Sequence, residues 1–197
     1  MTGGGGRGFP SATASRLPDA HKAEARLADA VAPFGGRLSC HMPATVPFSI
    51  DRVARADDGH DRWGTPGNQT VYLASDRGVA VAEYARHREP GASADARRIV
   101  DVRLQAVPVL DLRSASVLTA LGCSPSMQGG FDRATARRLS AELRDLGICQ
   151  GLLVPSMAFP DRPDRFNVVL FCERLQTDLG SLLFGVQEVG EIRVEGG

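Results

Sequence analysis

The chain has 197 residues, of which 43% are hydrophobic and 23% are charged, and its formal net charge is zero. This length and composition fit one globular domain with a single core. The balanced charge and the lack of a basic stripe argue against direct binding of nucleic acid, and no apolar run is long enough for a membrane helix.

The cysteines and histidines give no metal-binding or disulfide pattern. The four cysteines are far apart in sequence, and the four histidines lack the HExxH or paired spacing of a metal site. Reduced thiols are therefore expected, and the amino terminus has no apolar signal-peptide core. We predict a cytoplasmic protein that uses no metal ion and no bound cofactor.

The first 46 residues are expected to precede the main domain. Residues 1–15 are rich in glycine, serine and threonine, a composition typical of disorder. From Leu17 to Val31 apolar residues recur at helical spacing opposite charged ones, which predicts an amphipathic helix. Residues 32–46 contain several glycines and prolines and are interpreted as an irregular connection. The predicted divisions are 1–15, 16–46 for helix and connection, and 47–197 for the main domain.

The main domain is predicted to mix short strands with helices. We expect strands at 70–74, 98–106, 148–154 and 167–171, one or two more within 181–194, and helices at 75–88 and 131–146. In the second strand, alternation places Ala106 inward and Asp101 outward, and Pro108 should end the strand or mark a sheet edge. These elements predict an α+β fold, a single domain with a central mixed or antiparallel sheet flanked by helices.

Polar and aromatic residues that suit a reaction site stand in or beside these elements. Arg62 opens the loop Arg62-Trp63-Gly64-Thr65-Pro66-Gly67, Tyr72 lies in the first strand, Glu83 in the alanine-rich helix, and Ser156 directly after Leu152-Leu153-Val154-Pro155. With Asn167 in the next strand, this order resembles the RES domain, which is named for an arginine, a glutamate and a serine. The resemblance covers roughly residues 48–190. RES domains are the toxin components of bacterial toxin–antitoxin pairs.

The resemblance implies a reaction and a partner. RES proteins consume NAD⁺ and have a fold related to ADP-ribosyltransferases, so NAD⁺ is implied as the substrate. By position, Arg62, Glu83 and Ser156 are the implied catalytic residues, and Arg62, Tyr72, Ser156 and Asn167 the implied substrate-binding residues. A helical antitoxin of the Xre type is the implied protein partner.

These residue types suit cleavage of the bond between nicotinamide and ribose, which passes through a ribose cation. A planar guanidinium donates paired hydrogen bonds to phosphate oxygens. A carboxylate stabilises the developing positive charge. A tyrosine offers a flat face for nicotinamide, and a serine hydroxyl donates to ribose or phosphate. Ser156 is interpreted as such a donor, because no GxSxG nucleophile motif surrounds it.

Each residue also has a structural interpretation. Arg62 alone is compatible with an exposed loop arginine and Tyr72 with a residue at the sheet rim. Glu83 is within reach of Arg86 and His87 for a helix-surface ion pair, and Ser156 suits a turn. The sequence departs from the family beside Arg62, where His60-Asp61 and Gly64 replace the usual glycines and asparagine.

The predicted function is NAD⁺ degradation by hydrolysis or phosphorolysis, in the role of a toxin. Two alternatives stay open from the sequence. The same residues are compatible with a mono-ADP-ribosyltransferase that modifies a protein, because only the acceptor differs. They are also compatible with a catalytically idle module that binds NAD⁺ or another protein.

Overall fold

The computed structural model of the chain describes residues 20–56, 61–87 and 96–193. The predicted disorder of residues 1–15 lies outside the described residues. The helices and strands are α1 (Ala20–Asp29), β1 (Val31–Pro43), β2 (Ala54–Ala56), β3 (Gln69–Ala74), α2 (Arg77–His87), β4 (Ala96–Asp111), α3 (Ala115–Ala120), α4 (Arg133–Leu146), β5 (Gly151–Pro155), β6 (Phe166–Phe171), α5 (Leu179–Leu182) and β7 (Leu183–Arg193). Short 3-10 helices lie at Ile50–Arg52, Pro125–Gly129 and Cys172–Arg174.

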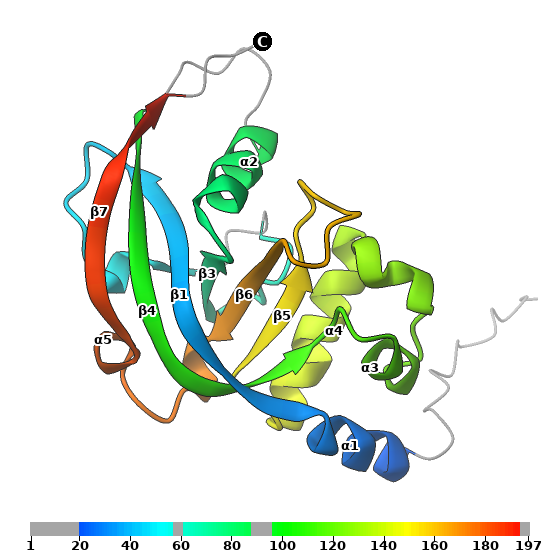
Figure 1. The fold of residues 1–197 in the computed structure, drawn as a ribbon. Coiled ribbons are helices and arrows are strands. Elements are labelled where there is room, and N and C mark those ends of the chain that lie inside the picture. The colour runs from blue at the N-terminus through cyan, green and yellow to red at the C-terminus, as the bar shows by residue number, and fades with distance from the viewer. Residues whose placement is uncertain (1–19, 57–60, 88–95, 194–197) are drawn as a thin grey trace, which may run out of the picture.

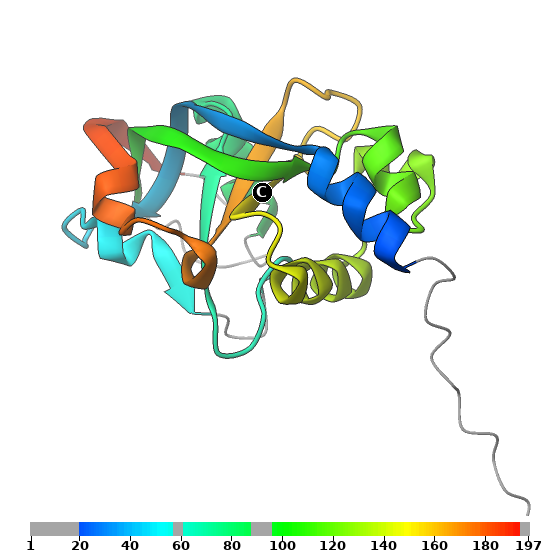
Figure 2. The same ribbon diagram turned by 90° about the horizontal axis from the view of Figure 1, so that it is seen from below.

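The strands close into a barrel with helices around it (Figures 1 and 2). The ring runs β1-β3-β6-β5-β4, and β4 pairs again with β1; β2 adds to β3, and β7 adds to β4. Among the described strands the β4–β5 pair is parallel and the other pairs are antiparallel. The α+β fold with a mixed sheet and flanking helices is therefore confirmed, and its closure is an addition to the prediction.

Two apolar clusters fill the fold, because successive strand residues point to opposite faces. One fills the inside of the barrel and includes Leu38, Val102 and Val168. The other lies outside β5 and β6, where α3 and α4 cover it, and includes Leu139 and Phe171. Helix α4 begins at an Asp132 cap and ends at Gly147, whose φ of 66° is the left-handed conformation that glycine favours.

The prediction of an irregular connection over residues 32–46 is wrong. Val31–Pro43 form β1, which pairs with β4 from Val31 opposite Leu110 to Pro43 opposite Arg97. Gly35 lies opposite a bulge in β4, and a Cβ on Gly35 would lie 2.8 Å from backbone atoms of Leu104 and Ala106. A composition typical of a loop thus forms a bent barrel strand inside the main domain.

Two details predicted for the second strand are also wrong. The strand continues through Pro108, which lies opposite Pro33 of β1 and accepts a hydrogen bond from the Gln150 backbone N–H at 2.8 Å. A bulge in β4 places Gln105 and Ala106 opposite the single residue Gly35, so the inward position moves from Ala106, which is exposed, to Val107, which is buried. A bulge changes the alternation on which the prediction relied.

Asp101, expected to face outward, is only 3% exposed. It points away from the barrel interior, but Arg37, Arg77 and Ser39 enclose it; the Ser39 hydroxyl donates to Oδ1 at 2.7 Å, and the Arg77 Nη2 lies 2.8 Å from Oδ2. Burial by itself would raise the pKa of Asp101, but hydrogen bonds from Arg77, Ser39 and Arg37 lower this pKa to about 2. Since Arg77 is the first residue of α2, this carboxylate ties α2 to β4.

Candidate active site

The ends of three strands bring the predicted residues to one end of the barrel. Asn167, near the start of β6, lies opposite Ala74 at the end of β3 and opposite Val154 near the end of β5. Ser156 follows β5 directly, and α2 follows β3 after a short turn. The Asp76 carboxylate caps that helix by accepting the Val79 N–H at 3.1 Å. These connections place Glu83, Ser156 and Asn167 side by side.

The carboxylate of Glu83 has two differently placed oxygens. Oε1 accepts hydrogen bonds from the Ser156 hydroxyl at 2.6 Å, the Asn167 side-chain amide at 3.2 Å and the Ala158 backbone N–H at 3.3 Å. Oε2 lies 3.8 Å from Nε2 of His87, and the Glu83 side chain is 14% exposed. Oε1 is therefore held by three donors, and none of these three donors bonds to Oε2.

Ser156 is fully buried, and its hydroxyl is engaged twice. It donates to Glu83 and accepts the Ala158 N–H at 3.2 Å. A hydroxyl that donates to a carboxylate and has no histidine bonded to it is unlike an activated nucleophile. In this structure Ser156 orients Glu83, and the expected direct contact with substrate stays a prediction.

Arg62 lies beside the same carboxylate and is surrounded by further cations. Its Nη1 donates to the Phe131 carbonyl just before α4. Burial lowers the pKa of Arg62, as do the charges of Arg86 and Arg133, whereas Glu83 raises this pKa. The pKa of His87 is also lowered, first by burial and then by Arg86, Arg62 and Arg133, against Glu83. Asp132 at the start of α4 also raises the pKa of Arg62, so the site combines the Glu83 and Asp132 carboxylates with Arg62, Arg86 and Arg133.

Tyr72 contacts the loop of Arg62. Its hydroxyl oxygen accepts the Trp63 backbone N–H at 3.1 Å, and its ring packs against the apolar cluster under α3 and α4. The structure therefore joins Tyr72 to Arg62 through Trp63. The expected contact between this ring and nicotinamide stays a prediction.

The sequence did not indicate some residues that build this site. Arg133 and the Phe131 carbonyl come from the start of α4, and nothing in their local sequence marks them. Arg165 holds Asp76 with its Nη1 2.6 Å from both carboxylate oxygens, and so fastens the loop after Ser156 to the start of α2. Asp76 was recognisable as a cap, but its partner lies too far along the chain for a spacing rule to find it.

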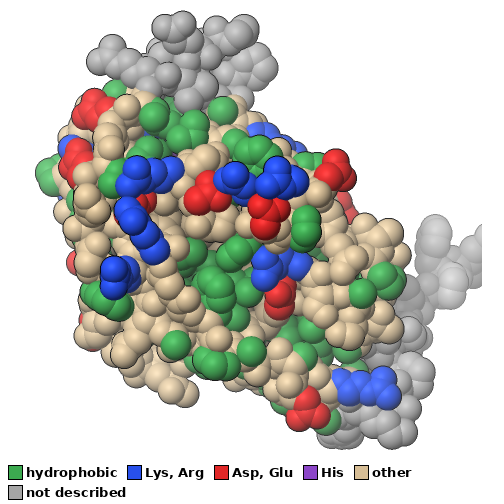
Figure 3. Space-filling view, viewed as in Figure 1, with side chains coloured by type: hydrophobic (Ala, Val, Ile, Leu, Met, Phe, Trp, Pro, Cys, Tyr) green, Lys and Arg blue, Asp and Glu red, His purple; other side chains and the backbone are tan. Residues whose placement is uncertain are grey.

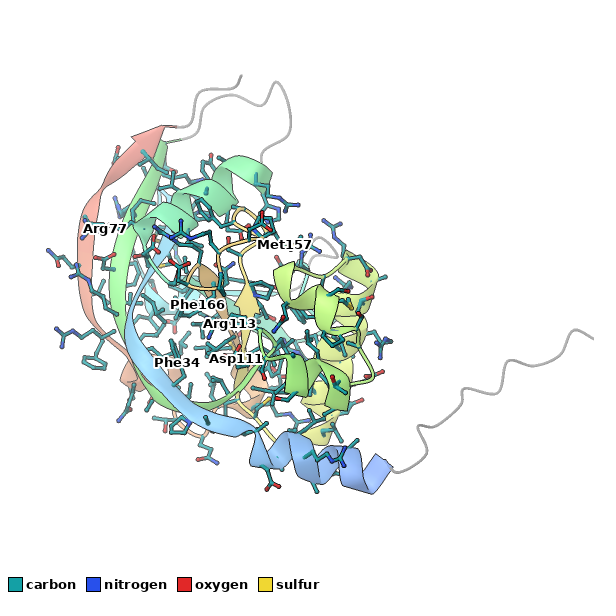
Figure 4. All side chains as sticks on the ribbon, turned by 45° about the vertical axis from the view of Figure 1, so that its right-hand side comes forward. Phe34, Arg77, Asp111, Arg113, Met157 and Phe166 are labelled. Atoms are coloured by element: carbon teal, nitrogen blue, oxygen red, sulfur yellow. The ribbon has the colours of Figure 1, made fainter. Side chains whose placement is uncertain are left out.

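An aromatic and charged cluster closes the barrel interior beside the site. The Arg113 guanidinium lies 4.2 Å from the Phe166 ring centre and is bonded to Asp111, and Phe34 meets Phe166 edge to face at 5.8 Å. Figure 4 shows these labelled side chains together, and Figure 3 shows apolar side chains at the centre of the same face with charged ones above them. Because Phe166 and Asn167 are neighbours in β6, they point to opposite faces. The cluster therefore lies across β6 from Glu83.

Within residues 20–56, 61–87 and 96–193, no three His, Cys, Asp or Glu side chains are grouped as a metal site would require. Metal-free chemistry stays a prediction. Among the same residues, the helices are too short or too polar to cross a membrane.

Comparison with known proteins identifies the family. Residues 14–180 match the RES domain, so this chain belongs to the RES domain family. The match starts ahead of α1 and β1, which were expected to lie outside the family pattern. No curated protein matches the chain significantly.

A solved structure with a similar fold is the crystal structure of the M. tuberculosis MbcT–MbcA toxin–antitoxin complex. The TM-score is 0.60 at 17% sequence identity, over 87% of this chain and 91% of that chain. At this identity the likeness establishes the fold.

Proposed function

We propose that this protein cleaves NAD⁺ at the bond between nicotinamide and ribose and acts as the toxin of a toxin–antitoxin pair. One observation carries the proposal: three donors hold one oxygen of Glu83, and the charge of Glu83 acts on Arg62 together with those of Arg86 and Arg133. Membership of the RES family supports NAD⁺ as the substrate. Arginines for phosphates and a fixed carboxylate for a sugar cation are the parts that this substrate requires.

In the proposed reaction, the arginines bind the pyrophosphate and Glu83 faces the ribose on the nicotinamide side. As the glycosidic bond breaks, nicotinamide leaves with the bonding electrons and the anomeric carbon becomes positive. The Glu83 charge stabilises this cation without rearranging, because Ser156, Asn167 and Ala158 already fix its position. Water then attacks the anomeric carbon and loses a proton, which gives ADP-ribose. Inorganic phosphate as acceptor would give the ADP-ribose phosphate.

The partner follows from the family and from the fold. The structure of similar fold is a toxin–antitoxin complex, which supports an antitoxin for this chain as well. We assign it to the helical Xre type on the RES resemblance, and we place the reaction in the cytoplasm. Co-expression of such an antitoxin should restore growth to cells that this protein arrests.

The test is to incubate purified protein with NAD⁺ and identify the products. Hydrolysis predicts equal amounts of nicotinamide and ADP-ribose, and phosphorolysis predicts ADP-ribose phosphate that appears only when phosphate is added. A further incubation uses NAD⁺ that is labelled in its ADP-ribose part. Transfer of this label to a protein band would instead identify an ADP-ribosyltransferase. Absence of free nicotinamide under all of these conditions would contradict the proposal and favour an idle binding module.

A further inference from the structure

Trp63, the residue after Arg62, is held at both backbone polar groups by side chains from other elements. Its N–H donates to Tyr72 of β3 at 3.1 Å, and its carbonyl accepts the Ser140 hydroxyl of α4 at 2.6 Å. The indole is 3% exposed and meets Phe131 edge to face at 5.2 Å. Trp63 is the backbone neighbour of Arg62, and it packs on Phe131, whose carbonyl accepts a hydrogen bond from the Arg62 guanidinium. The position of Trp63 therefore affects both the backbone and the guanidinium of Arg62.

The orientation of Ser140 depends in turn on Arg144, one helical turn later. The Arg144 Nε donates to the Ser140 hydroxyl oxygen at 3.2 Å. Arginine has donors only, so Ser140 must accept this bond and has its single proton free for the Trp63 carbonyl. The direction of both hydrogen bonds is therefore settled, from Arg144 through Ser140 to Trp63.

Arg144 is only 2% exposed, which is costly for a charged group unless its donors are satisfied. Its Nη2 donates to the Thr70 hydroxyl at 2.8 Å, its Nη1 bonds to Glu173, and its guanidinium lies 4.0 Å from the Phe171 ring centre. These partners fix the guanidinium from β3, β6 and the segment after β6. Because several partners hold the Arg144 guanidinium, it is a rigidly placed donor for the hydrogen bond to Ser140.

We propose that Arg144, acting through Ser140, is a positioning residue for Arg62. It sets the Trp63 carbonyl and hence the place from which Arg62 reaches the site. The catalytic half of this inference rests on the proposed function, in which Arg62 binds the phosphates of NAD⁺. The structural half concerns the loop alone and is measurable without any substrate.

The test compares Ser140→Ala with Thr70→Val. Each variant removes one buried hydroxyl that bonds Arg144, and only Ser140 contacts the Arg62 loop. Both should lower the melting temperature. Ser140→Ala alone should raise KM for NAD⁺, by about tenfold, with a smaller change in kcat, as expected for a misplaced binding group. In an Arg62→Lys background the effect of Ser140→Ala should largely disappear, because the two residues act through one contact.

A second readout does not require turnover. Trp63 is the single tryptophan of the chain, so its emission reports on this loop. Folded Ser140→Ala should show red-shifted emission and stronger acrylamide quenching than wild type. Thr70→Val keeps the bond from Ser140 to the Trp63 carbonyl and should change the emission less. Arg144→Met should act as Ser140→Ala does where it folds.

Three results would overturn the inference. The first is an equal rise of KM in Ser140→Ala and Thr70→Val. The second is that the effects of Ser140→Ala and Arg62→Lys on KM add fully in the double variant. The third is unchanged Trp63 emission in Ser140→Ala. If wild type releases no nicotinamide from NAD⁺, the proposed function fails, and the fluorescence comparison still decides whether Arg144 and Ser140 position the loop.

Discussion

The Ser156 hydroxyl donates to Oε1 of Glu83 at 2.6 Å, although 73 positions separate the two residues in sequence. This hydrogen bond joins the end of β5 to the middle of α2. The predicted serine of the site thus bonds directly to the predicted glutamate. In the proposed reaction Ser156 acts through the orientation of Glu83, so removing its hydroxyl should reduce the rate more than the affinity for substrate.

Ser156→Ala leaves Glu83 with two of its three donors, those from Asn167 and Ala158. We expect kcat for NAD⁺ cleavage to fall by about 10–100-fold, since a charge-assisted hydrogen bond contributes about 1.5–3 kcal/mol. Ser181→Ala, which removes a surface serine bonded to Asp178, is the matched control. Steady-state kinetics of the two variants measure the difference. A larger effect on KM than on kcat would show that Ser156 binds substrate directly.

Arg62→Lys keeps the positive charge but loses the planar fork that binds two phosphate oxygens at once. We expect KM for NAD⁺ to rise by about tenfold or more while kcat changes less. Arg138→Lys is the control, because Arg138 is an exposed arginine in a helix-surface pair with Glu142. Equal KM and kcat values for the two variants would contradict a role of Arg62 in binding NAD⁺.

Chelation tests the predicted absence of a metal ion. Nicotinamide release should be unchanged after dialysis against EDTA, because Glu83 and the surrounding arginines supply the charges that the reaction needs. The measurement is the initial rate before and after dialysis, with and without added Mg²⁺ or Zn²⁺. A rate that falls on chelation and returns with one of these ions would refute metal-free cleavage.

The buried Asp101 predicts a pH dependence of stability. Its folded pKa of about 2 is below the ordinary value of 3.8, so its stabilising contribution is present above pH 4 and is lost as pH falls from about 4 to about 2. We expect a loss of about 1–2 kcal/mol in the free energy of unfolding over this interval, after allowing for the exposed Arg37 and Arg77.

Asp101→Asn should be less stable than wild type at pH 7 and should lose less stability between pH 4 and pH 2. Urea denaturation at several pH values provides the comparison. Asp145→Asn, at an exposed position of α4, serves as a surface control. Parallel curves for wild type and Asp101→Asn would contradict the assignment of this acid sensitivity to Asp101.

Much of the site was predictable because its residues occupy the ends of regular elements. The alternation in β3 and β6, the strand before Ser156 and the Asp76 cap of α2 are local patterns, and they fixed which side chains reach one end of the sheet. Their order along the chain resembled the RES domain, a resemblance now confirmed.

What the sequence did not reveal depends on long-range packing. The glycines and prolines of β1 are typical of a loop, and Gly35 is needed only because β4 bulges against it. Closure of the barrel is visible only when β1 pairs with β4. Arg133 acts on the charge of Arg62 from the start of α4. Arg144 resembles an ordinary polar helix residue, yet Thr70, Glu173 and Phe171 bury it. Contacts between distant segments leave no periodic signal in either one.

Glu83→Gln tests the central claim most directly. Glutamine keeps the shape of the side chain, and its carbonyl oxygen can still accept from Ser156, Asn167 and Ala158, so the fold should survive. Only the negative charge is lost. Glu142→Gln, at an exposed position paired with Arg138, is the matched control.

The measurement is the rate of nicotinamide release from saturating NAD⁺ by folded Glu83→Gln and Glu142→Gln protein. We predict that Glu83→Gln lowers kcat by about 10²–10³-fold, a loss of about 3–4 kcal/mol of transition-state stabilisation, and that Glu142→Gln turns over as wild type does. Turnover of Glu83→Gln within about twofold of wild type, a difference of only about 0.4 kcal/mol, would contradict the claim that this carboxylate stabilises the ribose cation.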